Sequence, residues 1–162
     1  MTIETSQPAV TMEPIGTINS SFQNKAETPI QGVLAPESSG RVEIFPAYEA
    51  GLKDIEMFSH VILIYHLHQA GDLQLIRPTF LDDEPHGVFA SRHPCRPNGL
   101  GLTVVRLERR NGRFLEISGL DVLDGTPLLD LKPYIPKFDC FPGASEGWVA
   151  GKKIRSKPAG RE

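Results

Sequence analysis

The sequence predicts a mostly β protein: a small antiparallel β-barrel with one short helix and long functional loops. Three observations lead to this prediction. The chain contains 15 glycines and 14 prolines among 162 residues, which is high for a helical bundle and suits a turn-rich fold. Short β-branched runs lie between turn residues, without the strand–helix alternation of a doubly wound α/β protein. With 40% apolar and 23% charged residues, the chain suits one globular domain with a real core.

The amino-terminal half is expected to alternate short strands with long loops. Ile15, Thr17 and Ile18 suit a pleated surface, and Gly16 disfavours a helix. The connection at 23–40 is rich in Pro, Gly and Ser, and its length is typical of a functional loop. The expected elements are a strand at 14–22, a strand at 41–45, a short helix at 47–58, a buried strand at 60–69, a loop at 70–85 and a brief strand at 86–91.

The carboxy-terminal half contains the clearest local signal. Asn111-Gly112, between strand-like runs at 100–109 and 113–120, predicts a tight hairpin in which both central residues take positive φ. Asp124-Gly125 predicts the next turn, before a strand at 128–131. After Pro142 the strand-like pattern of apolar residues is no longer evident. We therefore expect a flexible N-terminal tail at 1–12, a barrel domain at 13–142 and a basic C-terminal tail or partner-dependent arm at 143–162.

Cysteine usage and hydropathy indicate a reduced, cytoplasmic protein. Cys95 and Cys140 cannot form a disulfide framework and lack the paired spacing of a zinc site. The first residues have neither the basic nor the apolar region of a signal peptide. The longest unbroken apolar run, at 61–65, is far shorter than the ~18 residues that span a bilayer, so no membrane association is expected.

Charge is distributed unevenly along the chain, whose formal net charge is −3. Residues 1–84 hold 12 acids and 4 bases, whereas residues 85–162 hold 8 acids and 13 bases. This asymmetry can give one basic face that suits a polyanion, although a solvated hairpin tip and a basic tail would give the same counts. The bases fall mostly in three groups: Arg92 with Arg96; Arg106, Arg109, Arg110 and Arg113; and Lys152, Lys153, Arg155, Lys157 and Arg161.

The segment at 91–98 is the most unusual stretch of the chain. Arg92 and Arg96 are interleaved with prolines, which exclude a helix and disfavour a regular strand. Guanidinium groups on such a rigid loop recognise carboxylate or phosphate well. The alternative is a surface loop whose arginines pair with the acids at 82–84. Cys95 is a weaker candidate nucleophile, because no third group to orient it is evident.

Two further polar groups have alternative interpretations. His60, His66 and His68 share strand parity and could hold a metal, as in a metal-dependent hydrolase. No acid lies beside them at a ligand-like spacing, so we expect no metal. A second polar set surrounds a turn. Its acids either stabilise the turn itself or belong to a site that uses buried charge. The set comprises Asp121, Asp124 and Asp130, with Lys132 and Tyr134.

Several motifs occur together in an order that is specific. They are Phe58-Ser59-His60, His68-Gln69, Gly87 to Arg92, Arg96-Pro97-Asn98 with Gly101, Leu120 to Pro127, and Asp130-x-Lys132-Pro133-Tyr134-x-Pro136. Over roughly residues 13–142 the chain resembles the TsaA-like family, which includes the YaeB/TrmO-type tRNA methyltransferases. Ile30 stands where the family commonly has Arg, Arg92-His93 replaces Arg-Ser, and Asn98 to Gly101 replaces Asn-Pro-Ile-Gly. We also expect the chain to lack the additional C-terminal domain of longer relatives.

The resemblance implies a small β-barrel, a homodimer, bound S-adenosyl-L-methionine (SAM) and a tRNA substrate. The implied reaction is methylation of N6 of threonylcarbamoyladenosine at tRNA position 37. The family's SAM contacts carry over onto Pro29, Ile30, Gln31, His68, Gln69, Arg92, Leu102, Asp121, Val122, Leu123 and Asp124.

Catalytic and tRNA-binding residues are predicted from the chemistry of that reaction. The acceptor nitrogen is weakly basic, so a nearby base should help, and we choose Asp130 and Tyr134, with Lys132 steadying an anionic group. The tRNA backbone is expected to contact Arg96, Arg109, Arg110 and Arg113 in a salt-sensitive way. One alternative is a non-catalytic SAM-binding module, favoured by Ile30; the other is the metal-dependent hydrolase.

Overall fold

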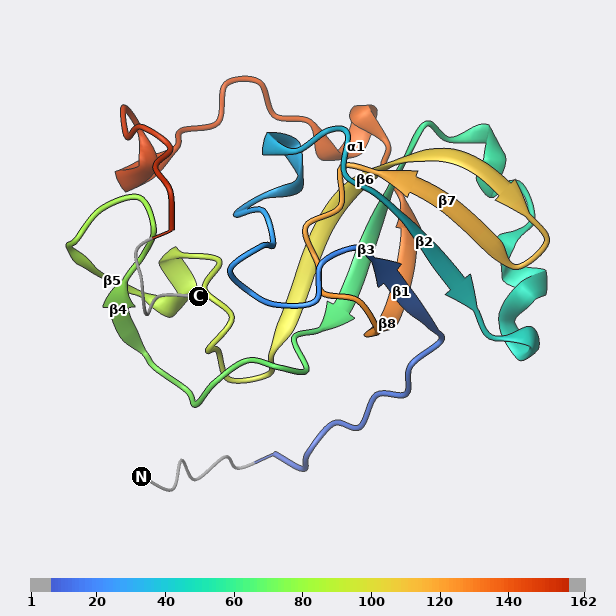
Figure 1. The fold of residues 1–162 in the computed structure, drawn as a ribbon, viewed down its shortest axis with the longest axis horizontal. Helices are drawn as coiled ribbons and strands as arrows, with labels where there is room; N and C mark the ends of the chain where they lie inside the picture. Colours follow the sequence, from blue (N-terminus) through green and yellow to red (C-terminus); the bar gives the residue numbers. More distant parts are fainter. Residues whose placement is uncertain (1–6, 158–162) are drawn as a thin grey trace.

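The computed structural model describes residues 7–157 of the chain. Within that range, six antiparallel strands close into a barrel in the order β1-β2-β7-β6-β3-β8, which confirms the predicted fold class (Figure 1). A two-stranded ribbon, β4-β5, lies beside the barrel. The barrel strands are β1 Gly16–Ser20, β2 Ser39–Ile44, β3 His60–His66, β6 Leu100–Asn111, β7 Phe114–Ser118 and β8 Thr126–Pro133, and the ribbon strands are β4 Ile76–Pro78 and β5 Pro85–Gly87.

The core fills the inside of the barrel. Successive side chains of a strand point to opposite faces, so β3 buries Val61, Leu63 and Tyr65 and turns the residues between them outward. Opposite strands contribute Ile18 and Leu115, which are fully buried. Each such side chain contributes about 1.5–3 kcal/mol relative to an exposed one. The wall is therefore held from inside, and its outward side chains and loops are available for binding.

The β6–β7 hairpin forms as predicted, but its turn lies one residue later. The strand register pairs Asn111 with Phe114, so Gly112 and Arg113 are the central residues. Gly112 has φ 58, and Asp54 is the one described non-glycine residue with positive φ. The expectation of positive φ at Asn111 is therefore wrong. A two-residue turn that begins with glycine needs positive φ at that first position alone, and Gly112 supplies it.

The short helix predicted at 47–58 is replaced by two 3₁₀ helices, η2 Pro46–Leu52 and η3 Ile55–Met57. The chain breaks between them at Asp54, whose φ is 69. Leu52, which ends η2, and Ile55, which begins η3, are both buried at the end of the barrel, on either side of this break. The prediction of a single helix here is therefore wrong, because a left-handed residue divides the stretch into two short helical turns.

Two other local predictions change. The brief strand at 86–91 becomes the end of β5 followed by a 3₁₀ turn, η4 Val88–Ala90, and the predicted loop before it contains β4. One short α-helix is present in the described chain, α1, at Pro136–Asp139. Further 3₁₀ turns are η1 Gly32–Leu34 and η5 Gly147–Val149.

The segment after α1 returns over the molecule to the β4–β5 ribbon (Figure 1). There the Trp148 ring stacks on His86 with centroids 3.8 Å apart, and its Nε1 donates to Ala90 O at 2.7 Å. Arg155 pairs with Asp83 at 3.0 Å. The residues that we expected to form a basic tail are thus packed on this ribbon as far as residue 157. Residues 1–6 and 158–162, including Arg161 of the third basic group, lie outside the described range.

Candidate functional site

A cleft of about 730 Å³ lies against the barrel, and loops that adjoin the β4–β5 ribbon form part of its lining. This volume is typical of sites for small molecules and cofactors. Four separated stretches and two single residues form its walls. These are parts of 25–31, 65–70, 89–102 and 121–126, together with Phe80 and Lys157.

The barrel side of the cleft depends on close packing of β3 against β6. Tyr65 pairs with Gly101 across these strands, and a Cβ on Gly101 would lie 2.2 Å from the Tyr65 ring. Only glycine leaves room for the ring there. Burial raises the pKa of the Tyr65 hydroxyl, the Asp121 carboxylate raises it further and Arg92 lowers it. Tyr65 therefore remains a neutral phenol.

Asp121 brings a carboxylate to the cleft from the β7–β8 loop. Its Oδ2 accepts a hydrogen bond from the Gly32 backbone N–H at 2.8 Å, whereas its Oδ1 is buried without a hydrogen-bond partner. Burial raises the pKa of Asp121, against the lowering effects of the Gly32 N–H, Thr103 and Arg92. A buried polar atom without a partner costs about 1–3 kcal/mol, so a ligand that donates to Oδ1 would recover that energy.

The arginine loop is held by its own second arginine. Arg96 Nη1 donates to three backbone carbonyls, Val88 O at 3.3 Å, Ser91 O at 3.1 Å and His93 O at 3.2 Å. Arg92 lies between two of these anchored residues and donates from Nη1 to Gln31 Oε1 of the opposite loop. The guanidinium of Arg92 is thereby presented to the cleft on a fixed backbone.

Beneath this loop, His93 is buried and 7% exposed. Its Nδ1 accepts from the Cys95 backbone N–H at 3.1 Å, and its Nε2 has no hydrogen-bond partner. Burial, followed by the positive charges of Arg77, Arg96 and Lys25, lowers the pKa of His93 to about 4. The imidazole is therefore neutral at physiological pH. Cys95 is buried with it and Cys140 is exposed, and both are free thiols.

The structure brings together all the predicted SAM contacts except Asp124. Those that line the cleft are Pro29, Ile30, Gln31, His68, Gln69, Arg92, Leu102, Asp121, Val122 and Leu123. Asp124 instead accepts from Ser20 N at 3.0 Å and from Asn19 Nδ2 at 3.3 Å, and the Ser20 bond is the main reason that its pKa is lowered. Asp124 therefore fastens the turn that precedes β8 to strand β1.

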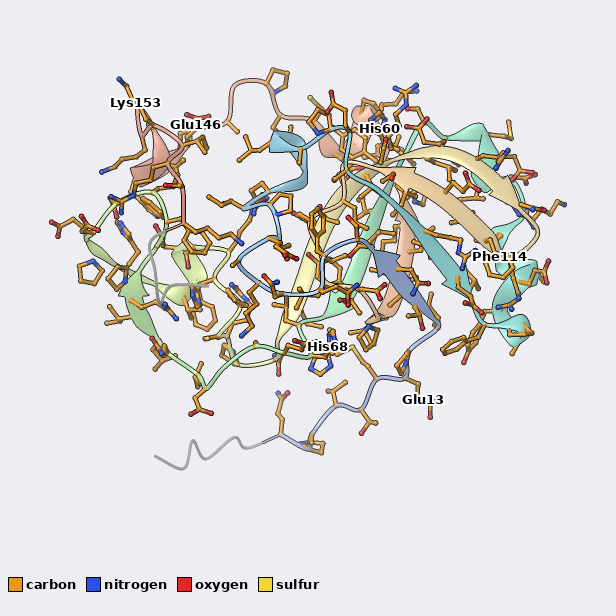
Figure 2. The ribbon with its side chains drawn as sticks, in the orientation of Figure 1. Glu13, His60, His68, Phe114, Glu146 and Lys153 are labelled. Carbon is orange, nitrogen blue, oxygen red and sulfur yellow. The ribbon has the colours of Figure 1, made fainter. Side chains whose placement is uncertain are left out.

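The predicted catalytic residues lie elsewhere on the barrel. Lys132 Nζ pairs with Asp130 Oδ2 at 2.9 Å, and the Tyr134 ring meets His60 edge-on at 6.4 Å. None of Asp130, Lys132 and Tyr134 is among the residues that line the cleft. His60 and His68 lie at opposite ends of β3 in Figure 2, with His68 at the cleft end. In a single chain, Asp130, Lys132 and Tyr134 therefore lie on the barrel wall outside the cleft.

The predicted tRNA-binding arginines separate into two places. Arg96 lines the cleft, whereas Arg109, Arg110 and Arg113 lie on the β6–β7 hairpin, on the side of the barrel away from the ribbon (Figure 1). Arg109 pairs with Glu116 at 2.9 Å and Arg110 with Glu56 at 3.3 Å. Arg113 pairs with Glu43 and lies over the Phe114 ring at 4.5 Å.

Sequence reasoning missed several residues of the cleft. Tyr65 was read only as part of a buried strand, and Lys25 only as part of a long connection. Lys157 belonged to the third basic group, which was the one sequence signal that pointed to it. The missed lining residues include Lys25, Thr28, Tyr65, Phe80, Phe89 and Lys157, whereas His66, considered as a metal ligand, lines the cleft instead.

Two expectations from the sequence concern a metal site and a membrane-spanning segment. Among residues 7–157, no three His, Cys, Asp or Glu side chains are grouped as metal ligands. In the same range, no helix has the length and apolar character needed to cross a bilayer.

Comparison with known proteins shows which family the chain is similar to. The model of the family "tRNA-methyltransferase O N-terminal domain" matches residues 17–140. A probable SAM-binding protein of Pyrococcus abyssi is 51% identical over 84% of this chain and 74% of its own length. A second probable SAM-binding protein, from Archaeoglobus fulgidus, is 44% identical over 91% of this chain and 40% of its own. The tRNA (adenine(37)-N6)-methyltransferase of Homo sapiens is 39% identical over 78% of this chain and 30% of its own.

Solved structures agree with these matches. A crystal structure of TrmO superposes with a TM-score of 0.77 at 42% identity, over 86% of this chain and 64% of that one. TrmO from Pseudomonas aeruginosa gives a TM-score of 0.74 at 40% identity, over 87% of this chain and 63% of that one. The chain thus spans less than two thirds of both TrmO structures.

Proposed function

Because the chain belongs to the tRNA-methyltransferase O N-terminal domain family, we propose that it is a SAM-dependent tRNA methyltransferase. The proposed reaction is methylation of N6 of threonylcarbamoyladenosine at tRNA position 37, in the cytoplasm. Relatives named as tRNA (adenine(37)-N6)-methyltransferases and as SAM-binding proteins support it. The observation that carries the proposal is the collection of ten expected SAM contacts, from distant loops, around one cleft: Pro29, Ile30, Gln31, His68, Gln69, Arg92, Leu102, Asp121, Val122 and Leu123.

The chemistry of the cleft suits SAM. The Arg92 guanidinium can take the carboxylate of the amino-acid end in a two-pronged, charge-assisted contact. The unpartnered Oδ1 of Asp121 can accept a hydrogen bond from an ammonium or hydroxyl group of the same ligand. Leu102 and Val122 provide apolar surface for an adenine ring. Each part of the molecule therefore has a complementary group among the lining residues.

The residues of the chain contribute mainly by positioning. Bound SAM would supply a methyl group carried on a sulfonium cation. Aligning an acceptor with such a donor can provide up to about 7–11 kcal/mol of the barrier. Arg96 holds the loop that carries Arg92, and the neutral Tyr65 hydroxyl can donate a hydrogen bond without adding negative charge.

We further propose that the protein acts as a homodimer through the outer face of β3, β6 and β8. On β6, Leu100, Leu102 and Val104 are 37%, 54% and 39% exposed and form an apolar stripe. The strand register places Ile64 between Leu102 and Asp130 on this face. A copy docked there would bring the partner's Asp130 toward the cleft wall at Leu102. Asp130, Lys132 and Tyr134 are then the proposed catalytic residues, acting on the neighbouring cleft.

Calorimetry tests the SAM site. The wild-type protein should bind SAM with one site per chain, and Arg92→Ala should abolish measurable binding because the carboxylate loses its charged partner. Arg109→Ala is the matched control, since it removes an arginine that is paired on the hairpin. Failure of the wild-type protein to bind SAM would refute the proposal.

Mass spectrometry of nucleosides tests the reaction. Incubation of the protein with SAM and tRNA that carries threonylcarbamoyladenosine should add the mass of one methyl group to that nucleoside. The second candidate function, a non-catalytic SAM-binding module, is favoured by the position of Asp130, Lys132 and Tyr134 outside the cleft of a single chain. SAM binding with an unchanged nucleoside would support that module and contradict methyl transfer.

A further inference from the structure

We propose that RNA is held at the rim of the cleft by Lys25, Arg96 and Lys157 and by stacking on Phe89, and that the arginines of the β6–β7 hairpin do not hold it. The ligand is the sugar–phosphate backbone of a single-stranded RNA segment with one base unstacked. This inference rests on the proposed function and identifies the surface by which the substrate reaches it.

The described lining of the cleft is strongly positive. Lys25, Arg92, Arg96 and Lys157 contribute permanent positive charges, and Asp121 is the one acid among the lining residues that the structure describes. Its carboxylate is already bonded to the Gly32 N–H. Positive charge gathered on a concave, partly apolar surface focuses the potential and attracts a polyanion.

The C-terminal segment delivers one of these charges from far along the chain. Lys157 Nζ donates to the backbone carbonyl of Lys25, 132 positions earlier in the sequence, and lies 5.5 Å from the centroid of the Phe80 ring. Two residues before it, Arg155 Nε donates to Phe80 O at 2.6 Å. The fold therefore places the Lys157 ammonium against the backbone of Lys25, and both residues line the cleft.

The buried His93 side chain responds to the same concentration of positive charge, to which Arg77 adds a further cation. Three cations, Arg77, Arg96 and Lys25, lower its pKa besides burial, and no acid is among the causes. Two acids beside the ribbon form ion pairs with bases of the C-terminal segment. Asp82 pairs with Lys152 at 2.9 Å and Asp83 with Arg155 at 3.0 Å.

Charge on the hairpin is instead balanced locally. All four arginines of this group have an acidic partner, so a nearby carboxylate offsets the positive charge of each. Little net positive charge is left to attract a phosphate backbone. The pairs are Arg106 with Glu108, Arg109 with Glu116, Arg110 with Glu56 and Arg113 with Glu43.

An aromatic side chain stands beside the positive rim. Phe89 lines the cleft and is 78% exposed, an unusual position for a large apolar ring in a charged site. Proteins that bind single-stranded nucleic acid combine a positive groove with exposed aromatic rings on which bases stack. Phe89 and the rim cations together present this combination.

Salt-dependent RNA binding tests the proposal. Fluorescence anisotropy would measure the affinity of a labelled anticodon stem-loop RNA at several salt concentrations. Two double variants remove equal charge: Lys25→Gln/Lys157→Gln at the cleft and Arg106→Gln/Arg109→Gln on the hairpin. Each lost phosphate contact reduces the slope of log affinity against log salt by about 0.7–0.9. For the cleft variant, which loses two contacts, the magnitude of the slope should therefore be about 1.4–1.8 smaller than for the wild type. The hairpin variant should have the wild-type slope.

A third variant tests stacking separately from charge. Phe89→Ala should weaken RNA binding by about 5- to 150-fold, since a stacked base is worth about 1–3 kcal/mol, and should leave the salt slope unchanged. Thermal unfolding of each variant verifies folding. Equal slopes in wild type and cleft variant, or a loss confined to the hairpin variant, would overturn the inference while leaving the proposed function intact. Absence of RNA binding by the wild type, despite SAM binding, would overturn both.

Discussion

At the scale of single residues, the cleft depends on positions where only one side chain fits. Gly101 is such a position, because the Tyr65 ring occupies the space of its missing Cβ. Asp121 is another, since one carboxylate oxygen joins the β7–β8 loop to the backbone of Gly32 and the other is buried without a hydrogen-bond partner. The sequence identified Asp121 through its family motif, whereas the contact between Tyr65 and Gly101 is visible only once the two strands are paired.

Gly101→Ala should destabilise the protein by about 1–3 kcal/mol, because an added methyl group forces the packed Tyr65 ring to move. The measurement is the free energy of unfolding in urea. Gly87→Ala is the matched control: it has negative φ and nothing within 4 Å of an added Cβ, so its change should stay within about 0.5 kcal/mol. Equal effects of the two variants would contradict the role of close packing at Gly101.

His93 should make the stability of the protein depend on pH. Its pKa is about 4 in the folded state, against an ordinary value of 6.5. As the pH falls from 6.5 to 4, His93 becomes protonated in the unfolded chain but stays neutral in the folded protein. The free energy of unfolding should therefore decrease by up to about 3 kcal/mol over this range. Below that range, this contribution should stay constant.

His93→Asn isolates this effect, because its side-chain oxygen can still accept the Cys95 N–H but does not titrate. Urea unfolding at several pH values should show a smaller decrease for the variant between pH 6.5 and pH 4. Carboxylates contribute equally to both proteins, so the difference between the two curves reports on His93. Parallel curves would show that the imidazole is not held neutral.

At the scale of elements, the barrel strands follow from alternation of apolar residues, and the errors come from short helical turns and from register. Residues 47–58 have helical spacing, but two 3₁₀ turns bury Leu52 and Ile55 at the barrel end instead of one α-helix. The hairpin turn moved by one residue because cross-strand pairing places Asn111 opposite Phe114. Local sequence specifies the kind of element, whereas neighbouring strands decide where it ends.

Trp148→Ala should release the C-terminal segment from the β4–β5 ribbon. The substitution removes the stack on His86 and the hydrogen bond to Ala90 O, together worth about 1–3 kcal/mol. Hydrogen exchange measured by mass spectrometry should become about 5- to 150-fold faster for residues 147–157 and stay unchanged in the barrel. Val149→Ala, at the next residue, is the control and should leave exchange at the wild-type rate. Unchanged exchange in Trp148→Ala would show that the ring does not anchor the segment.

At the scale of the whole molecule, the fold separates two kinds of surface. One side carries the cleft with its cationic rim, and the outer wall of β3 and β6 carries an apolar stripe that includes Leu102 and Val104. Leu102 belongs to both surfaces, so an interface on the wall would border the cleft. This arrangement is the basis for the proposed homodimer.

Val104→Asp should therefore convert a dimer into monomers, because it buries an unpaired carboxylate in the interface. Sedimentation velocity would give the mass of each species over a range of concentrations. Val10→Asp makes the same change on the N-terminal segment, where the side chain is 84% exposed, and should leave the dimer intact. A wild-type protein that sediments as a monomer at all concentrations would contradict the homodimer.

The sequence by itself determined the barrel class, most of its strands and nearly all the loops that meet at the cleft. It could do so because strand periodicity, turn residues and family motifs are properties of neighbouring positions in the chain. Only the tertiary structure decided which charges serve the cleft. The hairpin arginines and the tail bases look alike in sequence, yet the former are cancelled by acids on adjacent strands, and Lys157 reaches the rim beside Lys25. Electrostatic attraction depends on distance in space, and contacts such as Lys157 with Lys25, 132 positions apart, have no local signature in the sequence.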